Sequence, residues 1–325
     1  MHKKPNLLSV ITPAYNEDKN LPNLYSLLNE SLNGTGMAWE WIIVDDHSAD
    51  QTYLVANQIA KSDLRVKVFR FSRNFGSHAA IRCGLKHANG ACAAVLAADL
   101  QDPPEFIPNL LESWRHGADV VWAVRKSRQG ETLLTKIFSR LYYYIMRKIV
   151  RLNEMPPSGA DFFLIDRKVI DVLMTFEEGN YSVFSLLTWI GFSQKSLFYD
   201  KLARTNGRSG WTFSKKIKLA IDSVVSHSYT PIRFFSMLGF IIASCGFIYA
   251  LFILFNSIIG NYVIQGWASL MIVVLIIGGL QMIMLGVLGE YLWRTLEQSR
   301  KRPHYLIEAQ SNWKSFSESE AKIDY

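Results

Sequence analysis

An uncharged stretch near the C-terminus constrains this chain more than any other feature. The 56 residues from Phe234 to Gly289 contain no Asp, Glu, Lys, Arg or His. A bilayer core is crossed by about 20 apolar helical residues, so a stretch of this length holds two spans and a turn. Polar and glycine residues between positions 260 and 266 divide it, which predicts two transmembrane helices over about 232–258 and 267–292. The alternative is a buried helical hairpin of a soluble domain.

Basic residues flank this stretch, whereas the turn between the two expected helices is uncharged. Four precede or open the first helix and four follow the second: Lys215, Lys216, Lys218, Arg233, Arg294, Arg300, Lys301 and Arg302. By the positive-inside rule, both termini face the cytoplasm. We therefore expect a multi-pass protein of the inner (plasma) membrane, with the N-terminal part of the chain on the cytoplasmic side.

The cysteine content and the N-terminus agree with a cytoplasmic location. The chain has 3 cysteines and no CxxC pair, which argues against a disulfide framework and a zinc knuckle. The apolar run from Leu7 to Ile11 is too short for the apolar core of a signal peptide. Residues 129–233 carry +6 of the net charge of +7. Because this charge adjoins the apolar stretch and no recognition motif accompanies it, we expect contact with a membrane surface and no binding to nucleic acid.

Two segments of this basic region have the pattern of amphipathic helices. One covers about 132–150 and the other 211–230, and each has apolar residues on one side and lysines or arginines on the other. Helices of this composition lie in the headgroup plane of a membrane. The alternative is that they pack on a sheet.

Residues 1–128 alternate short apolar runs with polar helical stretches, the pattern of a mostly parallel α/β sheet covered by helices. The expected strands are Leu8–Thr12, Trp41–Val44, Val66–Phe71, Cys92–Ala97 and Val120–Val124. Polar clusters follow three of them, at 13–17, 45–50 and 99–104. Neither a GxGxxG nor a GxxxxGK[ST] motif occurs at these turns.

Ligands of such sheets bind beyond the carboxyl ends of the strands, where these clusters converge. Carboxylate and amide oxygens at a phosphate site imply a bridging divalent cation, Mg²⁺ or Mn²⁺. Taken singly, each cluster also has a structural explanation. Asp46 and Ser48 could cap the next helix, and Asp99 with Asp102 could form a turn before a helix that begins with proline.

The order and spacing of the clusters resemble the inverting family 2 glycosyltransferases of GT-A fold. Further motifs at 159–162, 204–211, 288–292 and 302–305 resemble the polyprenyl-phosphate branch, in particular the bactoprenol glucosyltransferases, with dolichol-phosphate mannose synthases as more distant relatives. The resemblance covers roughly residues 6 to 310. It implies a GT-A domain over 1–210, a juxtamembrane helix over 211–230, a transmembrane part over 231–293 and a cytoplasmic tail over 294–325, whose last 15 residues we expect to be disordered.

The resemblance also implies roles for individual residues. The nucleotide would be held by Pro13, Tyr15, Glu17, Asp45 and Asp46, and the metal with the diphosphate by Asp99 and Gln101. Asp161 is the implied catalytic residue. The phosphate and acceptor contacts would come from Arg125, Lys136, Arg140, Lys201, Arg204, Arg208 and Ser209.

Four positions depart from the family pattern, among them Lys201, where the family more often has arginine, and Gly210, where it more often has lysine. Ala97 stands where the family usually has a first metal-site aspartate, and Phe163 stands where it has an arginine after the Gly-Asp-Phe motif. Because a phosphate monoester is mostly dianionic at neutral pH, we expect Asp161 to orient the acceptor more than to deprotonate it.

The implied reaction is the inverting transfer of a hexose, with glucose as the first candidate, from UDP to undecaprenyl phosphate. The partners are then a nucleotide-sugar donor, a polyprenyl phosphate acceptor and the membrane, and we expect a homo-oligomer. The alternatives are another donor, GDP-mannose or a UDP-aminoarabinose derivative, or a membrane-tethered nucleotide-binding protein without activity.

Overall fold

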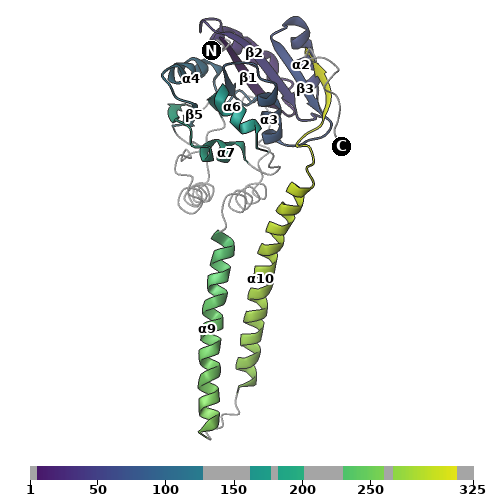
Figure 1. Ribbon diagram of the computed structural model, residues 1–325. Helices are drawn as coiled ribbons and strands as arrows, with labels where there is room; N and C mark the ends of the chain where they lie inside the picture. The colour runs from purple at the N-terminus through teal and green to yellow at the C-terminus, as the bar shows by residue number, and fades with distance from the viewer. Residues whose placement is uncertain (1–5, 127–161, 177–181, 201–229, 260–265, 313–325) are drawn as a thin grey trace. The chain divides into compact units, whose positions relative to one another are not determined.

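The computed structural model describes residues 6–126, 162–176, 182–200, 230–259 and 266–312 (Figure 1). Its contacts divide the chain into two compact units. The first unit comprises Met1–Ala220 and Pro303–Tyr325, and the second comprises Ile221–Arg302. The described part of the first unit contains a sheet with its covering helices, and that of the second contains two long helices.

In the described residues, the first unit is built on one eight-stranded sheet in the order β7-β5-β6-β4-β1-β2-β3-β8. The strands are β1 (Leu7–Ala14), β2 (Ala38–Asp45), β3 (Val66–Phe71), β4 (Cys92–Val95), β5 (Val120–Arg125), β6 (Phe162–Asp166), β7 (Gln194–Tyr199) and β8 (Ile307–Ser311). Only β6 and β8 run antiparallel to their neighbours in this described sheet. The expected mostly parallel α/β sheet is therefore confirmed.

All five strands predicted from apolar runs are present, and each is buried along most of its length. The strand β4 ends at Val95, two residues earlier than expected. The strand β6 lies between β4 and β5 and separates these two parallel strands. No sequence pattern predicts this insertion, nor the pairing of β8 with β3 at the outer edge.

Helices cover both faces of the sheet and complete the core. One face is covered by α1 (Leu21–Leu32), α2 (Thr52–Ser62), the short 3₁₀ helix η1 (Pro104–Phe106) and α4 (Ile107–Arg115). The other is covered by α3 (Ser77–His87), α6 (Arg167–Met174) and α7 (Val183–Trp189). Side chains alternate between the faces along each strand, as the pleat requires. Val10 therefore packs in the first cluster and Ile11 in the second.

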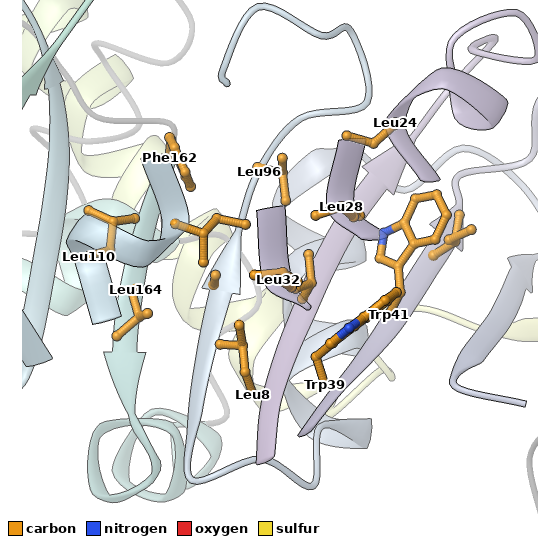
Figure 2. Close-up of a cluster of buried hydrophobic side chains, with 14 of the residues drawn as sticks. Leu8, Leu24, Leu28, Leu32, Trp39, Trp41, Leu96, Leu110, Phe162 and Leu164 are labelled. Carbon is orange, nitrogen blue, oxygen red and sulfur yellow. The ribbon is translucent and has the colours of Figure 1, made fainter. Parts of the chain in front are cut away.

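The first cluster illustrates how sequence spacing produces the packing (Figure 2). Leu24, Leu28 and Leu32 recur on one side of α1 and are fully buried against the sheet. Trp41 of β2 is also fully buried, and its Nε1 donates to Thr12 Oγ1 at 2.9 Å. A buried indole N–H usually needs such an acceptor, so this contact allows a large ring to fill the core.

The second unit contains α9 (Thr230–Ile258) and α10 (Trp267–Ser299), which contact each other. Both apolar segments expected from the sequence are thus single helices. Among the described residues, the 22-residue stretch Ile276–Glu297 of α10 is long and apolar enough to cross a membrane. The corresponding apolar stretch of α9, Met237–Tyr249, is shorter. The two-span hairpin therefore stays a prediction.

The stretch predicted as a cytoplasmic tail, 294–325, contains the end of α10 and the strand β8. The helix α10 continues to Ser299, and β8 joins the sheet of the first unit. Asn312 Nδ2 donates to the backbone oxygen of Val66 at 3.0 Å, which fixes the end of the strand. Most of the 15-residue stretch expected to be disordered lies outside the described residues.

Candidate active site

Three loops begin at one edge of the sheet, where β1, β2 and β4 end. The strand β1 lies between β2 and β4, and all three are parallel. Their carboxyl ends therefore lie at the same edge, which is where ligands bind in such sheets. The predicted residues at this edge are Pro13, Tyr15, Glu17, Asp45, Asp46, Asp99 and Gln101.

Hydrogen bonds join the loops that follow β1 and β2. The backbone N–H of Asn16 donates to Ser48 Oγ at 2.9 Å, and Asn16 Oδ1 accepts from the N–H of Ala49 at 2.9 Å. The N–H of Glu17 donates to Thr52 Oγ1 at 2.8 Å. Asn16 has a φ of 57°, a left-handed conformation that asparagine adopts more readily than most residues. The path of the first loop is therefore fixed by the second.

These bonds hold the predicted residues of the first loop in different environments. Pro13 is partly buried at the end of β1, whereas the Tyr15 side chain is half exposed at 49%. Glu17 Oε2 accepts from Asn20 Nδ2 at 2.5 Å. The Tyr15 ring is thus accessible to a ligand at this edge, whereas one oxygen of the Glu17 carboxylate already accepts a hydrogen bond from Asn20, the residue before α1.

Asp45 ends β2 as a fully buried carboxylate. Its Oδ1 accepts from the N–H of Ser48 at 3.0 Å. Its Oδ2 accepts no hydrogen bond from the described residues and lies 3.6 Å from Arg70 Nε. Burial raises the pKa of Asp45, and the Ser48 hydrogen bonds and the positive charge of Arg70 partly offset the rise. A buried acceptor of this kind needs a donor, which a ligand can supply.

Asp46 contacts a neighbouring loop instead of the helix that follows it. Its Oδ1 accepts from the N–H of Phe75 at 2.7 Å, and its Oδ2 accepts from the N–H of Gly76 at 2.9 Å. Burial raises the pKa of Asp46 to about 6 in spite of these two bonds. Neither Asp46 nor Ser48 caps α2, because the side chain of Ser48 bonds the first loop. Asp46 therefore fixes the turn that leads into α3.

Asp99 and Gln101 lie in a tight turn after β4. Leu100 between them has a φ of 57°, and the N–H of Gln101 donates to Asp99 Oδ1 at 3.2 Å. Asp99 is mostly buried, at 7% exposure, and Gln101 is partly exposed. Within the described ranges, no three His, Cys, Asp or Glu side chains are grouped so as to hold a metal ion. The carboxylate of Asp99 and the amide of Gln101 are nevertheless both hard oxygen ligands of the kind that Mg²⁺ and Mn²⁺ prefer.

A buried contact behind this turn is missed by the sequence patterns. The Tyr199 hydroxyl at the end of β7 donates to Asp102 Oδ1, and both side chains are buried. Burial, together with the negative charge of Asp102, raises the pKa of Tyr199, and the nearby positive charge of Arg125 lowers it. Asp102 and Tyr199 thus connect the turn after β4 to the end of β5, where the predicted phosphate ligand Arg125 lies. Asp102 is visible in the sequence only as part of an ordinary turn before two prolines.

The remaining predicted residues lie outside the described ranges. They are Asp161, Lys136, Arg140, Lys201, Arg204, Arg208 and Ser209, and the expected amphipathic helices at 132–150 and 211–230 fall there as well. Their assignments stay predictions.

Comparison with known proteins shows the family to which the chain belongs. Residues 9–174 match the profile of the family described as glycosyl transferase family 2. An uncharacterized glycosyltransferase of Synechocystis sp., sll0501, is 36% identical over 300 residues, which cover 92% of this chain and 94% of that protein.

Two further relatives carry a more specific name. The prophage bactoprenol glucosyl transferase homolog of Escherichia coli is 33% identical, over 92% of this chain and 98% of that protein. The bactoprenol glucosyl transferase of Shigella phage SfV is 32% identical, over 92% of this chain and 97% of that protein. The matched profile includes the loops after β1, β2 and β4, so the chain is a glycosyltransferase and belongs to glycosyltransferase family 2.

Proposed function

We propose that this enzyme transfers a hexose, with glucose as the first candidate, from UDP to undecaprenyl phosphate, inverting the anomeric carbon. One observation carries the proposal. The buried Asp45 carboxylate, with one oxygen free to accept a hydrogen bond, shares a sheet edge with the Asp99–Gln101 turn. Relatives named bactoprenol glucosyl transferase, matched over nine-tenths of this chain, support the choice of acceptor.

The first two loops suit the nucleotide. Asp45 Oδ2 can accept from an N–H of the base or a hydroxyl of the ribose, which would supply its missing hydrogen bond. The exposed ring of Tyr15, between Pro13 and Glu17, offers a face for stacking on the base. Asp46 would act indirectly, because both of its oxygens already accept from the backbone of the neighbouring loop.

The turn after β4 suits a divalent metal ion on the diphosphate. Asp99 and Gln101 would hold Mg²⁺ or Mn²⁺ from the protein side, and diphosphate oxygens and water would complete its ligands. When bound, the ion would neutralise charge that develops on the departing UDP. Only two protein ligands are proposed for the ion, because Ala97 stands where the family pattern has a further carboxylate.

The acceptor would supply its own nucleophile. A phosphate oxygen forms the new bond to C1 as the bond from C1 to the UDP oxygen breaks on the opposite side, so the configuration inverts. Because the phosphate monoester is already mostly dianionic, Asp161 would orient it more than deprotonate it. The side chains proposed to bind the acceptor phosphate or the diphosphate are the cations Arg125, Lys136, Arg140, Lys201, Arg204 and Arg208. The hydroxyl of Ser209 would add a neutral donor.

Helices α9 and α10 would form the membrane anchor. Both expose large apolar side chains, among them Phe240, Phe247 and Phe252 on α9 and Met282 on α10. Exposed apolar surface on this scale needs a lipid or protein partner. We propose a two-span hairpin in the inner membrane with the catalytic domain and both termini in the cytoplasm, and a homo-oligomeric assembly.

Product formation from a panel of donors tests the proposal. The purified full chain in detergent would receive Mn²⁺ or Mg²⁺, a short polyprenyl phosphate and, in separate reactions, UDP-glucose, GDP-mannose and UDP-aminoarabinose. We expect mass spectrometry to find a polyprenyl-phosphate hexose with UDP-glucose. A product with another donor would replace the sugar assignment. Nucleotide binding without product from any donor would favour the inactive, membrane-tethered alternative.

A pair of variants ties the activity to the proposed site. Asp99→Asn should abolish metal-dependent nucleotide binding and product formation. The matched control Asp171→Asn changes an exposed aspartate on α6, which pairs with Arg167 at 3.7 Å, and should leave both unchanged. Equal activity in the two variants would contradict the placement of the metal at the turn after β4.

A further inference from the structure

The C-terminal strand β8 brings one carboxylate close to the proposed nucleotide site. Glu308 Oε2 lies 3.6 Å from Arg70 Nε, and the same Nε lies 3.6 Å from Asp45 Oδ2. Arg70 Nε is buried and makes no hydrogen bond among the described residues. The guanidinium is therefore shared between a carboxylate of the proposed site and a carboxylate more than 200 residues later in the chain.

An irregularity in the strand pairing places Glu308 there. In the pairing of β8 with β3, Ala309 is the partner of Arg70 and Ile307 is the partner of Phe71, so Glu308 is an extra residue between two paired positions. A bulge of this kind redirects a side chain, and bulges are common at sheet edges beside active sites. His47, in the loop after β2, also lies near, with its Nδ1 3.6 Å from Glu308 Oε2 and 2.9 Å from the backbone oxygen of Phe71.

The strand around the bulge is held on both sides. Before it, Tyr305 stacks on Phe71 with ring centroids 5.0 Å apart, and the N–H of Ser72 donates to the backbone oxygen of Leu306 at 3.0 Å. After it, Ser311 Oγ donates to Asn57 Oδ1 at 2.6 Å. Figure 1 shows this strand, in yellow, beside β3. Glu308 is thus fixed in position by contacts other than its own charge.

The charge pair itself contributes little to stability. The Glu308 side chain is 51% exposed and that of Arg70 is 29% exposed, and pairs this accessible are usually worth less than about 1 kcal/mol. The contact between Glu308 and Arg70 therefore matters more for where it holds the guanidinium than for the stability of the fold. If Glu308 did not attract Arg70, the guanidinium could close on Asp45 and occupy the oxygen that is free to accept from a ligand.

We propose that Glu308 is a positioning residue for the nucleotide-sugar donor, which holds Arg70 back from Asp45 so that Asp45 stays available to the nucleotide. The inference rests on the proposed function, because it assigns Asp45 to the nucleotide. It makes the segment that follows α10 part of the donor site, although this segment lies far from the three loops in the sequence.

Calorimetric titration of the full chain with UDP and with GDP, in the presence of Mn²⁺, tests the proposal. Glu308→Gln preserves shape and removes charge, and should weaken binding of the preferred nucleotide about threefold to tenfold with an unchanged melting temperature. The control Ser311→Ala loosens the same strand away from Arg70, so it should lower the melting temperature and leave the Kd within about twofold. Arg70→Gln combined with Glu308→Gln should bind no more weakly than Arg70→Gln alone, since the two residues act through one contact.

Three results would overturn the proposal. The first is a Glu308→Gln protein whose Kd is that of the wild type. The second is a Ser311→Ala protein that loses as much affinity as Glu308→Gln, because the strand would then act only through stability. The third is a wild-type protein that binds neither nucleotide, and this result would overturn the proposed function as well.

Discussion

Replacement of Asp46 by asparagine should change how the stability of the protein depends on pH. Asp46 is nearly inaccessible, at 4% exposure, and burial raises its pKa from 3.8 to about 6. This rise corresponds to about 3 kcal/mol against the ionised folded state, at about 1.36 kcal/mol for each pKa unit. The stability that the protonated carboxyl contributes is therefore fully present below about pH 3.8 and is lost as the pH rises through about 6.

The expected effect lies in an accessible pH range. Between about pH 5 and about pH 7, the linkage relation gives a loss of about 1.3 kcal/mol from Asp46 alone. Asparagine at this position stays uncharged at every pH and resembles the protonated carboxyl. The melting temperature of Asp46→Asn minus that of the wild type should therefore increase by about 3 to 5 °C over this interval. The prediction concerns this increase and not the size of the difference at the lower pH.

The assay is thermal unfolding in detergent, followed by tryptophan fluorescence, for both proteins across this pH range. Asp171→Asn serves as the control, because it makes the same substitution at an exposed position on α6. Parallel curves for Asp46→Asn and the wild type would refute the reasoning. A difference of the opposite sign would mean that the hydrogen bonds from Phe75 and Gly76 outweigh the cost of burial.

Three further predictions concern the packing and the proposed metal site. Gly90→Ala places a Cβ 2.6 to 2.7 Å from three backbone atoms of β1 and β4, so it should lower the free energy of unfolding by about 3 kcal/mol. The control Gly34→Ala, whose Cβ would have nothing within 4 Å, should lower it far less. Equal melting temperatures of the two variants would contradict this expectation. Glu40→Gln removes the buried carboxylate that lies 2.6 Å from the ammonium of Lys67, and should lower the free energy of unfolding by about 3 kcal/mol. An unchanged melting temperature in thermal unfolding would exclude a role of this ion pair in stability. Ala97→Asp adds a carboxylate to the turn after β4 and should lower the Mn²⁺ concentration needed for nucleotide binding about tenfold; no gain would show that the ion does not bind there.

The central strands were predictable because their burial appears directly in the sequence. The continuous apolar runs at 41–44 and 92–97 match strands covered on both faces, and the polar clusters after them mark the carboxyl edge. The strand β6 is also buried along its whole length, but the sequence contains nothing about its direction. Its insertion between β4 and β5 depends on long-range pairing, which local periodicity does not encode.

The residues that were missed share a physical reason. Ile307–Ser311 is too short and too polar to be distinguished from a tail, and it becomes a strand only because β3 offers an open edge. Arg70 in β3 resembles any solvated residue of an edge strand until Glu308 and Asp45 are placed beside it. Tyr199 carries no motif, and its role follows from the buried contact with Asp102.

The most direct test of the central claim is the transfer of labelled glucose from UDP-glucose into lipid. The wild-type protein, with Mn²⁺ and a short polyprenyl phosphate, should move label into the organic phase, and the same protein with the unphosphorylated polyprenol should move none. Label that stays in the aqueous phase with the phosphorylated lipid, or that reaches the lipid equally well without its phosphate, would contradict the claim that this edge of the sheet serves a lipid phosphate acceptor.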